Sequence, residues 1–289
     1  MKKIHLYFLP LALLFSCGRL AKQPEVKTED STRIVCVSKQ YNEIIFSLGA
    51  QKHIVGIDIS STYPPETKAV PTVGYHRALS AEAILAARPS IIIHDNNIGP
   101  DHVVEQLNKL NIPMKVFGKY SSTIEGTDSL IREIGAYFNK SKEADSLCHL
   151  LDADMKAVLS TDRQKKDTVR VLVIHYGQAS NQYLVMTNKN VAAKMVAWAG
   201  GKFAISDEKG MKQISPELVA LSNPDVILMT DFGYDKLGGD FEKIKDLPGV
   251  SATNAFKNKR IYRIEEHDLV YMGPRTGKNV MLIEKLIHQ

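Results

Sequence analysis

The sequence has few cysteines, and their spacing fits no common metal site. It contains three cysteines in 289 residues, with no C-x-x-C pair and no cluster of cysteine and histidine, which argues against zinc. An HExxH motif, a G-x-S-x-G elbow and a phosphate-binding P-loop are also missing. A metal-assisted hydrolase using His94, Asp95 and His175 is the enzyme alternative, but these residues form no recognised metal motif. We therefore expect a protein that is not an enzyme.

Long runs of one charge sign are absent as well. The 37 Lys and Arg residues exceed the 32 Asp and Glu residues only slightly, and the basic residues are scattered along the chain. Nucleic-acid binding requires a clustered basic face, so we expect no nucleic-acid partner. A hydrophobic fraction of 44% and a charged fraction of 24% are globular values. The length allows one large domain or two ordinary ones.

The N-terminus has the pattern of an export signal. Two lysines precede an apolar run from Ile4 to Phe15, which is too short to span a bilayer. A small residue followed by Cys17 is similar to a bacterial lipoprotein signal, in which the cysteine is lipidated; an ordinary signal peptide is the alternative. We predict a signal peptide over residues 1–16 and a lipid-anchored tether over 17–32. The protein would then be periplasmic and held at a membrane, or lie on the cell surface where the organism has a single membrane.

A short pattern occurs twice, 135 residues apart, without a gap. In each copy a serine, Ser80 or Ser215, precedes a short helical segment with Glu82 or Glu217 in its first turn. A proline and an apolar strand then follow. Serine caps a helix N-terminus, and an acid there interacts favourably with the helix dipole. One αβ unit repeated at half-length spacing predicts two similar lobes, and a cleft between lobes is a common small-molecule site.

A segment with helical spacing and no strand signal separates the two halves. Its apolar residues recur at intervals of three and four from Ala144 to Val158, which predicts one long helix. On both sides of it, apolar strands alternate with helices, as in α/β proteins with largely parallel sheets. We predict an α/β fold with lobes over residues 33–138 and 164–289 and a connecting helix over 139–163.

Three segments together resemble a known family. They are Tyr41–Ala50, the motif Gly-Tyr-His-Arg-Ala-Leu-Ser-Ala-Glu over Gly74–Glu82, and Gly-Pro-Arg-Thr over Gly273–Thr276. From Arg33 to its end the chain resembles the substrate-binding proteins of bacterial ABC importers that carry iron–siderophores, cobalamin or heme. The second and third motifs resemble the heme branch. The resemblance implies two Rossmann-like lobes with largely parallel sheets, joined by one long helix.

Tyr75 is the candidate iron ligand, because the resemblance places it where heme-binding members ligate ferric iron. Ferric iron is a hard ion that favours an anionic oxygen, and tyrosine is a known axial ligand. A free phenol has a pKa of about 10, so its ionisation requires nearby positive charge. Iron would supply most of that charge, and Arg77 could supply more. The alternative is an amphipathic loop tyrosine that closes the cleft.

Further residues are candidates for contacts with heme. His175 follows an apolar strand, and some heme-binding relatives have a histidine here; it is either a second iron ligand or a polar cleft wall. The two propionates need cationic donors, and the porphyrin faces need apolar contacts. The candidates for these cleft contacts are Arg77, Arg275, Lys39, Tyr271 and Met272.

The resemblance also assigns a docking role to Glu82 and Glu217, because one exposed acid on each lobe contacts the permease in this family. Complementing the helix dipole is the simpler role, and other acids such as Glu43 or Glu208 could share the docking. We therefore expect a monomeric heme-binding lipoprotein that delivers heme to an ABC permease and its ATPase. The alternative cargo is a ferric siderophore or cobalamin.

Overall fold

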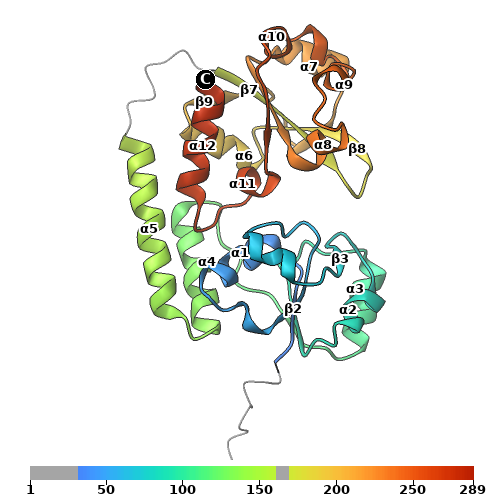
Figure 1. Ribbon diagram of the computed structural model, residues 1–289, viewed down its shortest axis with the longest axis vertical. Helices are drawn as coiled ribbons and strands as arrows, with labels where there is room; N and C mark the ends of the chain where they lie inside the picture. Colours follow the sequence, from blue (N-terminus) through green and yellow to red (C-terminus); the bar gives the residue numbers. More distant parts are fainter. Residues whose placement is uncertain (1–31, 161–168) are drawn as a thin grey trace, which may run out of the picture. The chain divides into compact units, whose positions relative to one another are not determined.

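The computed structural model describes residues 32–160 and 169–289, which form two α/β lobes (Figure 1). The predicted signal peptide, Cys17 and nearly all of the predicted tether lie outside the described residues, as does the predicted boundary at residues 163 and 164. Among the described helices, none is both long enough and apolar enough to cross a bilayer. Cys36 and Cys148 are buried free thiols.

The N-terminal lobe is built on a four-stranded parallel sheet in the order β2-β1-β5-β6. Every residue of its first strand is buried, as is usual where helices cover both faces of a parallel sheet. A small antiparallel hairpin, β3-β4, follows β2 and carries Tyr75. The strands are β1 (Ile34–Cys36), β2 (Ile54–Ile57), β3 (Gly74–Tyr75), β4 (Ala78–Leu79), β5 (Ile91–Ile93) and β6 (Met114–Lys115).

The C-terminal lobe has a six-stranded mixed sheet, in which five strands follow the order β10-β8-β7-β11-β12 and the sixth, β9, pairs with β7. Its long strand β7 pairs in parallel with β11 and β9, and in antiparallel with β8. Strand β8 and its antiparallel partner β10 were not predicted from the sequence. The strands are β7 (Val169–Gly177), β8 (Gln182–Met186), β9 (Gly201–Phe203), β10 (Met211–Gln213), β11 (Val226–Thr230) and β12 (Ile261–Ile264).

One long helix, α5 (Ser141–Ser160), links the two lobes, as predicted. It packs against α4 (Ile124–Tyr137) of the first lobe and α12 (Thr276–His288) of the second, and Figure 1 shows it running beside both. The apolar stripe expected between Ala144 and Val158 contains Leu147 and Cys148, of which Leu147 is only partly buried and Cys148 is fully buried. The residues that α5 buries are Ala144, Cys148, Leu151, Met155 and Val158.

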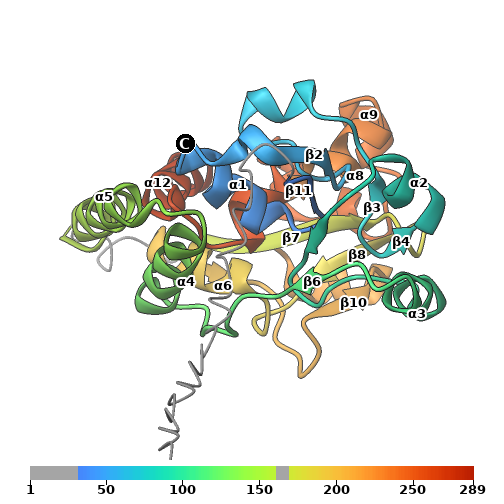
Figure 2. The ribbon, with the colours of Figure 1, turned by 90° about the horizontal axis from the view of Figure 1, so that it is seen from below.

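The repeated unit predicted from the sequence is present in both lobes. Ser80 accepts a hydrogen bond from the Ala83 amide at the start of α2 (Ala81–Ala86), and Ser215 caps α7 (Pro216–Ser222) in the same way. Seen from below in Figure 2, α2 and α3 lie on the opposite side of the sheets from α5 and α12. The remaining helices are α1 (Lys39–Ser47), α3 (Asp101–Lys109), α6 (Val191–Trp198), α8 (Asp231–Lys236), α9 (Phe241–Ile244), α10 (Asn254–Lys257) and α11 (Glu266–Val270).

Gly277 allows α12 to approach α5 closely. A Cβ atom at this position would overlap the side chain of Asp154 and lie 3.1 Å from the Met155 amide nitrogen. We expect Gly277→Ala to lower the free energy of unfolding by about 1–3 kcal/mol, the usual cost of overpacking. Urea denaturation measures this loss, and Gly210→Ala is the control because nothing lies within 4 Å of its Cβ position. Equal midpoints for the two variants would contradict the close approach.

Candidate functional site

Two neighbouring cavities lie where the ends of strands from both lobes meet. The first, which we call the Tyr75 cavity, has a volume of about 390 Å³ and is lined by residues of both lobes, among them Tyr75, Arg77, His175 and Glu266. The second, the Lys119 cavity, has a volume of about 430 Å³. The two cavities share four lining residues, so together they form one divided cleft: Asn97, Val191, Val270 and Tyr271.

Tyr75 is held at the cavity by the β3-β4 hairpin. A buried carboxylate, Asp58, follows β2 and accepts a hydrogen bond from the backbone amide of His76, whose ring nitrogen Nδ1 lies 3.0 Å from the same oxygen. The ring of Tyr75 packs on the His76 ring with centroids 4.3 Å apart. Asp58 therefore fixes the two-residue turn and, through it, the position of the Tyr75 phenol.

The environment of Tyr75 keeps its phenol protonated in the free protein. Burial raises the pKa of Tyr75, and the carboxylate of Glu266 raises it further, against the opposing charges of Lys39 and Arg77. A cation that enters the cavity would reverse this balance, because positive charge favours the phenolate. Tyr75 would therefore ionise only if a positive charge entered the cavity.

His175 lies within β7, near its C-terminal end, and is 7% exposed. Its Nδ1 lies 3.1 Å from the Thr230 hydroxyl and 3.9 Å from a carboxylate oxygen of Glu266. Burial lowers the pKa of His175, with Glu266 opposing the shift, so the ring is neutral near pH 7. A neutral imidazole has a lone pair on one nitrogen, which is the form that binds a metal.

The predicted cationic residues are separated by the fold. Arg77 lines the Tyr75 cavity and donates from Nε to the Asn97 amide oxygen at 2.9 Å. Lys39 is buried and lies 2.5 Å from Glu266, with its ammonium 4.9 Å from the centre of the Tyr271 ring. Arg275 lines neither cavity; it donates to Glu43 at 2.8 Å and to Asp268 at 2.6 Å.

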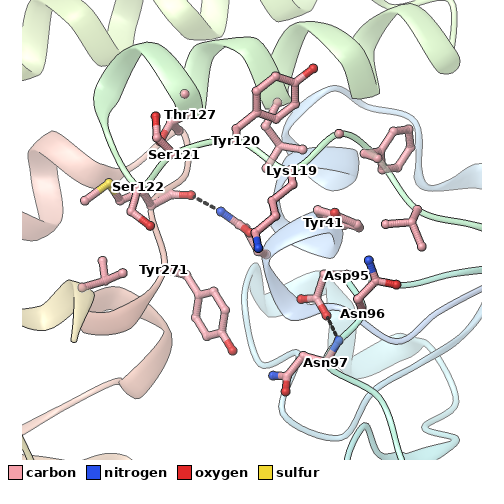
Figure 3. Close-up of a pocket in the computed structure, with 18 of the residues that line it drawn as sticks. Tyr41, Asp95, Asn96, Asn97, Lys119, Tyr120, Ser121, Ser122, Thr127 and Tyr271 are labelled. Atoms are coloured by element: carbon pink, nitrogen blue, oxygen red, sulfur yellow. Dashed lines mark hydrogen bonds between the residues drawn. The ribbon is translucent and has the colours of Figure 1, made fainter. Parts of the chain in front are cut away.

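Several polar side chains line the Lys119 cavity (Figure 3). Tyr271 separates it from the Tyr75 cavity, and the buried Met272 lines it from the same segment. Lys119 and two serine hydroxyls, from Ser121 and Ser122, come from the loop between β6 and α4. Neither this loop nor Glu266 was predicted from the sequence to line the cleft, because neither lies within a motif.

The two acids assigned to docking are both exposed. Glu82 and Glu217 occupy the same position in the first turn of α2 and α7. Glu43, which the sequence analysis treated as an exposed acid, is in fact 3% exposed and bonded to His267 and Arg275. In the described part of the chain, no three His, Cys, Asp or Glu side chains cluster as a metal site would require.

A family model described as periplasmic binding protein matches residues 34–267. The "Uncharacterized ABC transporter substrate-binding lipoprotein YvrC" of Bacillus subtilis is 24% identical over 97% of this chain and 94% of its own. A "Vitamin B12-binding protein" of Pectobacterium atrosepticum is 22% identical over 73% of each chain. Among solved structures, the "Periplasmic heme-binding protein RhuT" of Roseiflexus sp. RS-1 superimposes with a TM-score of 0.79 at 30% identity, covering 89% of this chain and 98% of its own.

Proposed function

This chain belongs to the family of periplasmic binding proteins, and we propose that it is the heme-binding subunit of an ABC importer. The observation that supports this most is the meeting of Tyr75 and His175, from opposite lobes, at one cavity. A phenolate and an imidazole are both established axial ligands of heme iron. The likeness to a heme-binding protein over 89% of the chain supports the same cargo.

Heme would be bound through this chain's side chains without covalent chemistry. Tyr75 supplies the iron ligand, and His175 supplies a second one. Arg77 pairs with a propionate at the Tyr75 cavity, and Lys119 is the cation available at the adjoining cavity. We propose no such role for Arg275 or Lys39, because carboxylates of the protein already hold both. Tyr271 and Met272 provide contacts for the ring.

A titration with hemin tests the cargo. Mixing the purified residues 32–289 with hemin is expected to give a Soret band that saturates at one or two equivalents. Cobalamin and a ferric siderophore are the competitors, since a relative of this chain is named for vitamin B12. Absence of the Soret band, together with tight binding of either competitor, would transfer the proposal to that cargo.

Cys17 is proposed to carry a lipid that anchors the protein to a membrane. One relative is named a lipoprotein, and Cys17 stands where a lipoprotein signal would place the modified residue. The anchored protein would be periplasmic, or at the surface of a cell with a single membrane. Cys17→Ser is expected to release the mature protein from the membrane fraction.

Glu82 and Glu217 are proposed to dock onto the permease, one from each lobe. Both are exposed at equivalent positions, which suits contact with a partner that has two related halves. We expect Glu82→Lys or Glu217→Lys to reduce hemin uptake by cells about tenfold, because opposed like charges weaken an interface. The hemin affinity of the purified protein should not change. Glu242→Lys, on the exposed helix α9, is the matched control; equal losses for all three would contradict docking at the repeat.

A further inference from the structure

A largely buried carboxylate, Glu266, lines the Tyr75 cavity, although its negative charge would repel an anionic ligand. Among the described residues that line this cavity, Glu266 is the only carboxylate. Its side chain is 14% exposed. A charge so buried costs free energy unless it is paired, so its partners indicate what it does.

The partners of Glu266 come from both lobes. The ammonium of Lys39, in α1 of the N-terminal lobe, lies 2.5 Å from one carboxylate oxygen. The other oxygen lies 3.9 Å from Nδ1 of His175. The backbone amide of Glu266 donates to Asp231 at 2.9 Å, which fixes the start of α11. The salt bridge to the Lys39 ammonium compensates the charge of this buried carboxylate.

The position of Glu266 bears on which nitrogen of His175 carries the proton. Thr230, 3.1 Å from Nδ1, can either donate to that nitrogen or accept from it. A negative charge 3.9 Å away favours an N–H at Nδ1 over a lone pair there. With the proton on Nδ1, the lone pair resides on Nε2. That tautomer leaves Nε2 free to bind a metal.

We propose that Glu266 is a positioning residue, which acts through His175 to keep Nε2 available for iron and which favours ferric over ferrous heme. Lys39 reaches it from the opposite lobe and limits the strength of its charge. This inference rests on the proposed heme function and concerns the side chains that surround the iron. Residues behind a ligating histidine commonly alter metal affinity by about 10–100-fold.

The opposite charges of Glu266 and Lys39 should shift the midpoint potential of bound heme in opposite directions. Ferric heme has one more positive charge than ferrous heme, so a nearby carboxylate stabilises the ferric form and lowers the midpoint potential. Removing Glu266 should therefore raise the potential. Removing Lys39 should lower it, because the carboxylate then acts without its counter-charge. A role confined to packing would not produce shifts of opposite sign.

The experiment compares Glu266→Gln, Lys39→Met and the double variant, each loaded with hemin at pH 8. In Glu266→Gln, we expect the ratio of ferric to ferrous affinity to fall about tenfold, a rise of about 59 mV for a one-electron couple. Its electron paramagnetic resonance spectrum should lose the histidine-ligated species, as in His175→Ala. Lys39→Met should shift the potential downward. The potential of the double variant should lie between those of the single variants, because both charges are removed, but its spectrum should still lack the histidine-ligated species. This combination tests the inference even if a single variant folds poorly.

Two controls complete the test. Glu242→Gln removes the same charge from an exposed pair with Lys245 on α9 and should leave the spectrum and potential unchanged. Glu266→Asp should restore part of the wild-type potential. Hemin bound to Glu266→Gln with the wild-type potential and histidine signal would overturn the inference and leave the heme function standing. Failure of the wild type to bind hemin would instead overturn the proposed function.

Discussion

Tyr75→Phe is expected to lower the affinity for hemin on the order of 100-fold, or about 2.7 kcal/mol. The substitution removes one oxygen atom and leaves the ring, whose packing on His76 should persist. The oxygen is the only atom of this side chain that can bind ferric iron. The substitution therefore tests the ligand atom separately from the ring. Because hydrophobic contacts and His175 remain, we expect weakened binding in place of complete loss.

Absorption spectroscopy measures this effect through the Soret band and the charge-transfer band that an iron–phenolate bond produces. Tyr137→Phe is the matched control, since this half-exposed tyrosine lies on α4 and lines neither cavity. An affinity of Tyr75→Phe within a factor of two of the wild type would contradict the assignment of the iron ligand.

Coordination of iron by Tyr75 also predicts that the affinity for hemin depends on pH. The pKa of free Tyr75 lies above its ordinary value of 10.0 because of burial and Glu266, so binding as the phenolate releases one proton. Apparent affinity should then rise up to about tenfold per pH unit below that pKa. The dependence should be absent from Tyr75→Phe, which has no proton to release.

Much of the fold could be predicted because its signals are local. The serine caps of α2 and α7 and the buried strands that follow them are short patterns with a direct physical cause. The strands β8 and β10 were missed because they form an antiparallel edge. Only the end of β8 is fully buried, and β10 includes no buried residue, so neither has a continuous apolar run.

The candidate site was predictable only in part, because some of its residues belong to local patterns and others depend on contacts between distant parts of the chain. Tyr75 lies in a sequence motif and His175 near the end of a predicted apolar strand, so both could be proposed from local patterns; both line the Tyr75 cavity. Charged residues are different, because their roles depend on which opposite charge faces them. Arg275 meets Glu43 over a separation of 232 residues, and Lys39 meets Glu266 over 227. No periodicity or spacing in one sequence reveals such pairs.

Glu43→Gln is expected to lower the free energy of unfolding by about 3–5 kcal/mol, the usual cost of breaking a buried ion pair. Glu43 belongs to α1 of the N-terminal lobe and is 3% exposed. It is hydrogen-bonded to His267 of the C-terminal lobe and accepts from Nε of Arg275 at 2.8 Å. Loss of its charge would deprive the buried His267 of this partner and leave Arg275 paired with Asp268 alone, which weakens a contact that joins the lobes. Urea denaturation measures the change.

Acidification should have the same effect on the wild type. Burial alone would raise the pKa of Glu43, but the hydrogen bond and charge of His267, followed by those of Arg275, outweigh it and place the pKa below the ordinary 4.5. A lowered carboxyl pKa contributes stability above the unfolded-state value, and that contribution is lost as pH falls from about 4.5 through the lower folded-state value.

The control separates a buried pair from an exposed one. Asp235→Asn breaks a pair with Arg263 whose side chains are 56% and 38% exposed, so its cost should stay below about 1 kcal/mol. Stability of Glu43→Gln should also vary less with pH than that of the wild type as the pH falls below about 4.5, because the lowered pKa of this carboxyl is then absent. A variant that loses under 1 kcal/mol and keeps the full pH dependence would show that the lobes are held together by apolar packing along α5 instead.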